Sequence, residues 1–148
     1  MDLGERFGED DLTVAVAESL TGGLLSSRLA RMEGASQWFR GGLVAYASDV
    51  KRSLLAVPPG PVVSESAVLH MAKEATRLFG ADFAVAVSGV GGPEPQDGLP
   101  PGTVWIGVHG PHGATAHLHR FDGDPPTVCD RTCDAALDLL AAAARASS

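Results

Sequence analysis

Short apolar runs without polar interruption are the feature that most restricts how this chain can fold. Leu12–Ala17 (LTVAVA) is rich in β-branched residues and bounded by polar ones, and Phe83–Val87 (FAVAV) is a second such run, so we interpret both as strands. A third strand is expected near Gly42–Tyr46. Strands that are buried on both faces need helices on each side, which predicts a parallel or mixed sheet between two helical layers.

Helical patterns occupy the intervals between these strands. Helices are expected from Gly23 to about Met32, around Lys51 and no further than Pro58-Pro59, from Ser64 to Gly80, and from about Thr127 to Ala144. Thr103–Val108 and Ala116–Phe121 are interpreted as two more strands, joined by a turn at Gly110–Gly113. This late strand pair favours a mixed, mostly parallel sheet over a purely parallel one.

The composition is that of one globular domain. The chain has 148 residues, of which 45% are hydrophobic and 20% charged, so we predict a single domain over residues 1–148 with frayed ends at 1–10 and 146–148. Its 11 Lys and Arg against 18 Asp and Glu give a net charge of −7, which argues against nucleic acid or an anionic membrane as partner. The acidic start differs from a signal peptide, and no apolar run approaches the ~20 residues of a membrane span, so a cytoplasmic location is expected.

The cysteines and histidines do not form a pattern that predicts a metal site. Cys129 and Cys133, four residues apart on an expected helix, supply half of a zinc site at most, and we interpret them as small core residues. His117 and His119 share one face of a strand, but no cluster of Cys, Asp or Glu accompanies them. No metal is therefore expected.

Three polar or glycine-rich segments follow the expected parallel strands. They are Glu18–Gly23, Tyr46–Lys51 and Ser88–Pro93. In open α/β sheets, ligands bind beyond the carboxyl ends of the strands, so these segments are the candidates for a ligand site.

The first segment has two interpretations. Ser19 is a nucleophile if a base stands beside it, and the unshielded amides of Gly22 and Gly23 before a helix suit an anion such as phosphate. The alternative is a tight strand-to-helix turn in which Ser19 and Thr21 only cap. The spacing does not decide between the two.

The other two segments are also open to two interpretations each. Lys51 becomes a general base toward a serine hydroxyl if a desolvated pocket lowers its proton affinity, but most lysines are solvated surface residues. Ser36 is a further hydroxyl in a loop, either polar lining or a cap. The glycines Gly89, Gly91 and Gly92 suit close approach of the backbone to a flat ligand and suit an irregular turn equally well.

Several separate motifs in one order give the chain a family resemblance. The motifs are Ala17-Glu18-Ser19-Leu20-Thr21-Gly22-Gly23, Gly34-Ala35-Ser36, Gly41-Gly42-Leu43-Val44-Ala45-Tyr46 with Lys51, Val63-Ser64-Glu65, Gly80-Ala81-Asp82, Ser88-Gly89-Val90-Gly91-Gly92-Pro93 and Gly102-Thr103-Val104. Over about residues 12–140 the chain resembles the C-terminal domain of the CinA (competence/damage-inducible) proteins. That family includes the stand-alone nicotinamide-nucleotide amidohydrolases. The resemblance does not extend to the N-terminal domain of full-length CinA proteins.

The resemblance implies a fold and a reaction. The fold is a three-layer α/β/α sandwich with a mixed sheet, and a homodimer is the expected assembly. The reaction is hydrolysis of the carboxamide of nicotinamide mononucleotide to nicotinate mononucleotide and ammonia, a step of pyridine-nucleotide salvage, without a metal or organic cofactor.

The resemblance also implies roles for individual residues. Ser19 is the nucleophile, Lys51 the general base, and Tyr46 orients groups or stabilises charge. Ser36 and Ser88 match additional pocket hydroxyls. The backbone amides expected to hold the nucleotide are those of Thr21, Gly22 and Gly23 together with Gly89, Gly91 and Gly92.

The sequence departs from the family pattern on the side expected to hold phosphate. The loop Pro93–Pro100 differs from the usual one, and Pro125 follows Gly123-Asp124 where family members commonly carry an arginine. That substitution removes a fixed cation suited to phosphate, for which Arg120 or Arg131 are the candidate replacements. Two alternatives therefore stand beside the amidohydrolase: a nucleotide-binding protein with weak or no amidase activity, and an amidase with another substrate.

Overall fold

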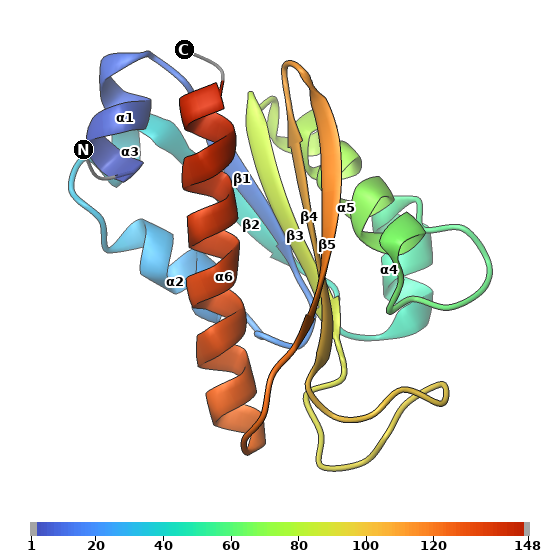
Figure 1. Cartoon of the computed structure of the whole chain (residues 1–148). Helices are drawn as coiled ribbons and strands as arrows, with labels where there is room; N and C mark the ends of the chain where they lie inside the picture. Colours follow the sequence, from blue (N-terminus) through green and yellow to red (C-terminus); the bar gives the residue numbers. More distant parts are fainter. Residues whose placement is uncertain (1–2, 147–148) are drawn as a thin grey trace.

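The predicted apolar runs lie side by side in one sheet. The computed structural model describes residues 3–146, and in that range the sheet has five strands, β1 (Val14–Glu18), β2 (Phe39–Val44), β3 (Phe83–Gly89), β4 (Thr103–Gly110) and β5 (Gly113–Arg120), in the order β2-β1-β3-β4-β5 (Figure 1). β1 pairs in parallel with both β2 and β3, whereas β3–β4 and β4–β5 are antiparallel. Only β4 therefore runs against the other four, which confirms the mixed, mostly parallel sheet.

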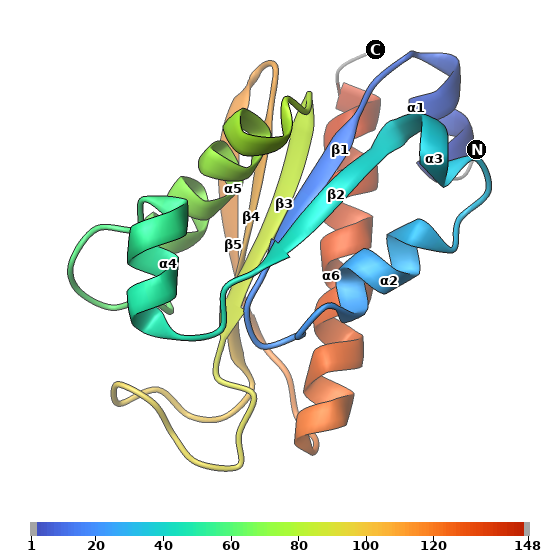
Figure 2. The ribbon, with the colours of Figure 1, turned by 180° about the vertical axis from the view of Figure 1, so that it is seen from behind.

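Helices cover both faces of this sheet, which confirms the three-layer α/β/α sandwich (Figures 1 and 2). One layer contains α1 (Leu3–Glu9), α2 (Leu24–Ala30), α3 (Ala35–Trp38) and the long α6 (Pro125–Ala146). The opposite layer contains α4 (Ser48–Leu55) and α5 (Glu65–Phe79).

The alternation of large and small residues along β1 and β3 makes the two layers different. Val14 and Val16 point into the core under α6, whereas Ala15 and Ala17 point into the core under α5. Small side chains allow α5 to approach the sheet closely. At Gly107 of β4 an added Cβ would lie 2.6 Å from the carbonyl oxygen of Val68 on α5, so only glycine fits that position.

The ends of α5 lie where the sequence predicts them. The Ser64 hydroxyl accepts a hydrogen bond from the N–H of Ala67 (3.1 Å), which caps the first turn. Gly80 ends the helix with a positive φ of 60°, a conformation that glycine adopts without the steric cost of a Cβ.

The amino end of the chain differs from the expectation of fraying. Residues 3–9 form α1, in which the Phe7 side chain is completely buried and stacks on Trp38 with ring centroids 5.8 Å apart. Arg6 also donates to the carbonyl of Ala144 on α6 (3.0 Å). The other residues expected to fray are Asp10, which follows α1 and donates its N–H to the Arg6 carbonyl, Ala146, the last residue of α6, and residues 1–2 and 147–148, which lie outside the described range.

The third strand also differs from its prediction. β2 ends at Val44 and lies at the edge of the sheet, with half-buried and exposed residues in alternation, so it is not buried on both faces. Ala45 and Tyr46 belong to the segment that leads into α4. This strand therefore carries less apolar side-chain surface than a central strand needs.

Gly102 is the position where a small substitution has the largest expected effect on stability. Its φ is +89°, and an added Cβ would overlap the carbonyl oxygen of Phe121. We expect Gly102→Ala to lower the free energy of unfolding by about 3 kcal/mol, from the left-handed conformation plus overpacking. Equilibrium unfolding in urea measures this change in the free energy of unfolding. The control is Gly98→Ala, where φ is +75° but nothing lies within 4 Å, and about 1 kcal/mol is expected. Equal losses for the two variants would contradict the steric argument.

Candidate active site

A cavity of about 380 Å³ opens at the carboxyl ends of the parallel strands. These strand ends lie at the bottom of the sheet in Figure 1. The three segments that follow β1, β2 and β3 all contribute to its lining, and the first turns of α6 close the remaining side. The lining residues are Ser19, Leu20, Tyr46, Lys51, Gly89–Gln96, Pro125 and Cys129. The cavity is therefore formed by segments far apart in the sequence.

Ser19 and Lys51 are the two buried reactive side chains of this cavity. Ser19 follows directly after the last residue of β1, and Lys51 lies on α4, one turn before the buried Leu55 and so on the same inward face of the helix. Each residue is only 3% exposed. Tyr46 also lines the cavity but is 73% exposed, so its phenol stands at the rim.

The environment of Lys51 changes its acidity. Burial disfavours the charged ammonium, and the nearby positive charge of Arg52 adds to that effect, so the pKa of Lys51 falls from 10.5 to about 8. Within residues 3–146 the amino group has no carboxylate in ion-pair distance to offset this. A neutral amine is therefore accessible near physiological pH, as a general base requires.

Two glycine amides of the turn after β1 are already paired inside the protein. The buried Glu18 carboxylate accepts from the N–H of Gly23 (3.2 Å) and from the Thr21 hydroxyl (2.6 Å). The N–H of Gly22 donates to the carbonyl of Ser19 (3.1 Å). Thr21, Gly22 and Gly23 do not line the cavity, and the N–H groups of Gly22 and Gly23 donate within the turn, so a role for these residues in holding a nucleotide stays a prediction. The Glu18 carboxylate occupies the start of α2.

The glycine segment after β3 does face the cavity. Gly89 is required by packing, because an added Cβ would lie 2.8 Å from the Thr103 carbonyl oxygen on β4. Gly91 and Gly92 follow it, and in the described part of the chain their N–H groups donate to no acceptor. These two amides are therefore available to a ligand.

The two additional serines lie outside the cavity. Ser88 is completely buried, and its hydroxyl donates to the carbonyl of Val62 (2.7 Å), which fastens the segment before α5 to β3. Ser36 is exposed on α3, which lies near the amino ends of the parallel strands and so at the other end of the sheet from the cavity (Figure 1). Neither serine lines this cavity: Ser88 faces a backbone carbonyl, and Ser36 precedes β2 instead of following it, so their role as pocket hydroxyls stays a prediction.

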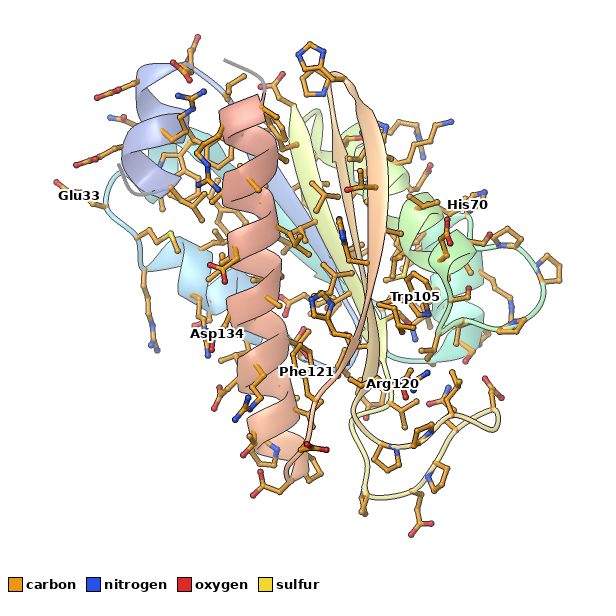
Figure 3. All side chains as sticks on the ribbon, viewed as in Figure 1. Glu33, His70, Trp105, Arg120, Phe121 and Asp134 are labelled. Atoms are coloured by element: carbon orange, nitrogen blue, oxygen red, sulfur yellow. The ribbon has the colours of Figure 1, made fainter. Side chains whose placement is uncertain are left out.

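The cations considered as replacements for the family arginine also lie elsewhere. Arg120 donates to the Thr103 hydroxyl (2.9 Å). Arg120 and Trp105 lie on the same face of the sheet as each other and line a separate hollow (Figure 3). Arg131 is exposed on α6 and does not line the cavity. Pro125 does line it, but proline has no N–H to donate.

Two residues near the site were not among those predicted from the sequence. Glu18 was noted only as part of a motif, because it ends β1 six residues before Leu24, the first residue of α2, and capping side chains are usually sought directly before a helix. Cys129 lines the cavity, and its thiol donates to the carbonyl of Leu20 (3.3 Å), which joins α6 to the turn after β1. Burial raises the pKa of this thiol, so it stays protonated near neutral pH. Cys133 is buried in the core as predicted.

The described part of the chain has neither a metal-binding cluster nor a membrane-spanning helix. Residues 3–146 contain no group of three or more His, Cys, Asp or Glu side chains placed to hold a metal ion. None of the helices in that range is long and apolar enough to cross a membrane.

The chain belongs to the CinA C-terminal domain family, whose model matches residues 1–144. It is 44% identical to a CinA-like protein of Frankia casuarinae over 133 residues, 86% of this chain and 31% of that protein. It is 37% identical to a putative competence-damage inducible protein of Desulforamulus reducens over 142 residues, 93% of this chain and 34% of that protein. The chain thus spans about a third of the length of these two relatives.

Solved structures agree with the fold. A CinA superfamily protein from Enterobacter cloacae matches with a TM-score of 0.92 and 30% identity, over 96% of this chain and 88% of that chain. A competence or damage-inducible protein from Enterobacter asburiae matches with a TM-score of 0.93 and 31% identity, over 96% of this chain and 93% of that chain.

Proposed function

We propose that this chain is an amidohydrolase with Ser19 as nucleophile and Lys51 as general base, and that its substrate is nicotinamide mononucleotide. The observation that carries the proposal is the cavity in which a buried serine hydroxyl and a buried lysine with a pKa of about 8 come together. A hydroxyl needs a base to become a nucleophile, and a lysine that is neutral in part is such a base.

The proposed reaction follows from these groups. Neutral Lys51 accepts the Ser19 proton while Oγ attacks the carboxamide carbon, and the carbonyl oxygen becomes an oxyanion. The unpaired N–H groups of Gly91 and Gly92 are the cavity's backbone donors for this charge or for the phosphate, with the Tyr46 phenol at the rim. The protonated Lys51 then returns the proton to the leaving ammonia, and an acyl ester on Ser19 remains. Water attacks the ester with Lys51 again as base, which releases nicotinate mononucleotide and restores the serine.

The size of the cavity is compatible with this substrate. About 380 Å³ falls in the range of small-molecule sites, and the flat glycine segment suits an aromatic ring. Pro125 stands where family members commonly have the arginine, so the phosphate has no fixed cation there and the Gly91 and Gly92 amides are the candidate donors to it where they do not serve the oxyanion.

A second substrate class is favoured by the charges of the cavity. Among residues 3–146 the charged residues that line it are Lys51 and Glu94, and the start of α2 is already occupied by Glu18. An uncharged carboxamide that lacks phosphate, such as the corresponding nucleoside, needs no further cation.

Ammonia release from purified protein tests both substrates. We expect release from nicotinamide mononucleotide, and comparison with its nucleoside and with free nicotinamide ranks the contribution of the phosphate and the ribose. Faster turnover of the nucleoside would replace the nucleotide as substrate. No release from any of the three, together with micromolar binding of the nucleotide in calorimetry, would overturn the amidohydrolase and leave a nucleotide-binding protein.

A further inference from the structure

Glu18 is the most extensively hydrogen-bonded side chain beside the cavity. Its carboxylate is completely buried. One oxygen accepts from the Thr21 hydroxyl (2.6 Å), the N–H of Gly23 (3.2 Å) and the N–H of Leu25 (2.9 Å). The other accepts from the N–H (2.9 Å) and the hydroxyl (2.5 Å) of Ser26. All the acceptor capacity of the carboxylate is used within this one turn and the start of α2.

We propose that Glu18 is a positioning residue that fixes the direction of the Ser19 hydroxyl. The inference rests on Ser19 being the nucleophile. Before Ser19 the backbone is held in β1 by its pairing with β2 and β3, and the carbonyl of Glu18 accepts from the N–H of Ala45 (2.8 Å). After Ser19 the chain has no strand to hold it. There the five hydrogen bonds to the Glu18 side chain hold it, together with the bond from the Gly22 N–H to the Ser19 carbonyl and the bond from the Cys129 thiol to the Leu20 carbonyl, so the nucleophile is fixed from both sides.

The surrounding sequence accommodates this arrangement. Ser26 reaches Glu18 beside Gly42 of β2, where an added Cβ would overlap the Ser26 hydroxyl and lie 2.7 Å from Cγ2 of Val16. A glycine at position 42 is therefore a condition for the contact between Ser26 and Glu18. The negative charge is also favourable at the start of α2, where the N–H groups of the first turn have no acceptor within the helix and donate to Glu18 instead.

Glu18 does not take part in the chemistry itself. Its side chain is absent from the cavity lining, and both oxygens face donors of the turn and α2. Its effect on the reaction therefore passes through the position of Ser19, and the pH dependence set by Lys51 is expected to stay the same when Glu18 is changed.

The test replaces the carboxylate by its isosteric amide. In Glu18→Gln, the side-chain NH₂ meets N–H and O–H donors, so part of the turn loses its acceptor. We expect kcat to fall by about 10- to 100-fold, the effect of a small misplacement of the nucleophile, with KM changed less than about twofold. Labelling of Ser19 by a fluorophosphonate, a serine-directed reagent that needs no substrate recognition, is expected to slow by a similar factor.

Asp82→Asn is the matched control. The Asp82 carboxylate accepts from the N–H (2.9 Å) and hydroxyl (3.1 Å) of Thr13, at the other end of β1 from the cavity. The substitution makes the same chemical change at that remote end, and we expect kcat and labelling to remain at the wild-type level. Both variants are compared at a temperature where circular dichroism shows each to be folded.

The outcomes separate positioning from stability. Labelling of folded Glu18→Gln at the wild-type rate would overturn the inference, and so would an activity loss that only follows the unfolded fraction. If Glu18→Gln does not fold, Thr21→Val and Ser26→Ala remove hydroxyl donors to the carboxylate one at a time, and each is expected to lower kcat a few-fold without changing the pH midpoint. Wild-type activity at these variants would overturn the inference. Absence of Ser19 labelling in the wild type would instead overturn the proposed nucleophile, on which the inference rests.

Discussion

Replacing Ser19 by alanine is expected to lower ammonia release from nicotinamide mononucleotide by at least about 10³-fold, the magnitude found when a catalytic nucleophile is removed. The substitution removes one oxygen from a residue that is 3% exposed, at the end of a strand whose pairing does not depend on the hydroxyl. The fold and the affinity for the substrate are therefore expected to persist. Steady-state ammonia assays and calorimetry measure the two quantities separately.

The control for this variant is Ser53→Ala. Ser53 lies on α4 close to Lys51 in sequence, but it is exposed, and its hydroxyl contacts only the carbonyl of Val50 (3.4 Å). Activity at the wild-type level is expected there. Turnover by Ser19→Ala within tenfold of the wild type would show that the serine is not the nucleophile.

The second large effect concerns Lys51 and pH. The base must be neutral, so kcat/KM is expected to rise with pH and to level off above about pH 8, where the pKa of Lys51 lies. At pH 7 about one tenth of the lysine is neutral with this pKa, against about one in three thousand for an ordinary lysine. The lowered pKa therefore raises the fraction of neutral amine at pH 7 by a factor of about 300.

Two substitutions test the role of the amine. Lys51→Met removes the base, and Lys51→Arg keeps a charge that does not deprotonate in proteins, so both are expected to lose activity by at least about 10²-fold. Retention of the pH midpoint near 8 in Lys51→Arg would contradict the assignment. Arg52→Gln provides a milder variant: it removes the second cause of the lowered pKa of Lys51, so the midpoint is expected to move upward.

Lys51→Met is also expected to stabilise the protein at pH 7. The pKa of Lys51 is lower in the folded chain than in the unfolded one, so the unfolded chain binds more protons between about pH 8 and 10.5 and stability rises with pH across that window. Below about pH 8 the full cost of burying the charge is present. Methionine removes that cost, and a higher melting temperature with no activity is the expected combination.

Much of the site could be predicted from the sequence because its position follows a general rule of α/β folds. Once Leu12–Ala17 and Phe83–Val87 are interpreted as parallel strands, the segments after them meet at one edge of the sheet, and Ser19, Lys51 and Gly91 line the same cavity. The placement of Ser36 could not be derived in this way. The resemblance associated it with the pocket, but its helix precedes β2 and lies at the opposite edge.

The sequence by itself determined the features that depend on residues close together in the chain. The period of apolar residues defines α5, Ser64 and Gly80 define its ends, and the alternation of valine and alanine defines the two faces of β1. These features depend on local geometry, which repeats every two or 3.6 residues.

Only the tertiary structure decided which partner each polar group takes. The amides of Gly22 and Gly23 look available to an anion in the sequence, but in the fold Gly23 donates to Glu18 and Gly22 to Ser19. From the sequence, Lys51 could equally be an ordinary solvated lysine. In the fold, the packing of α4 buries Lys51 beside the cavity and lowers its pKa. The physical reason is the same in both cases: hydrogen bonding and desolvation depend on which groups the folded chain brings into contact, and a periodic pattern carries no information on those contacts.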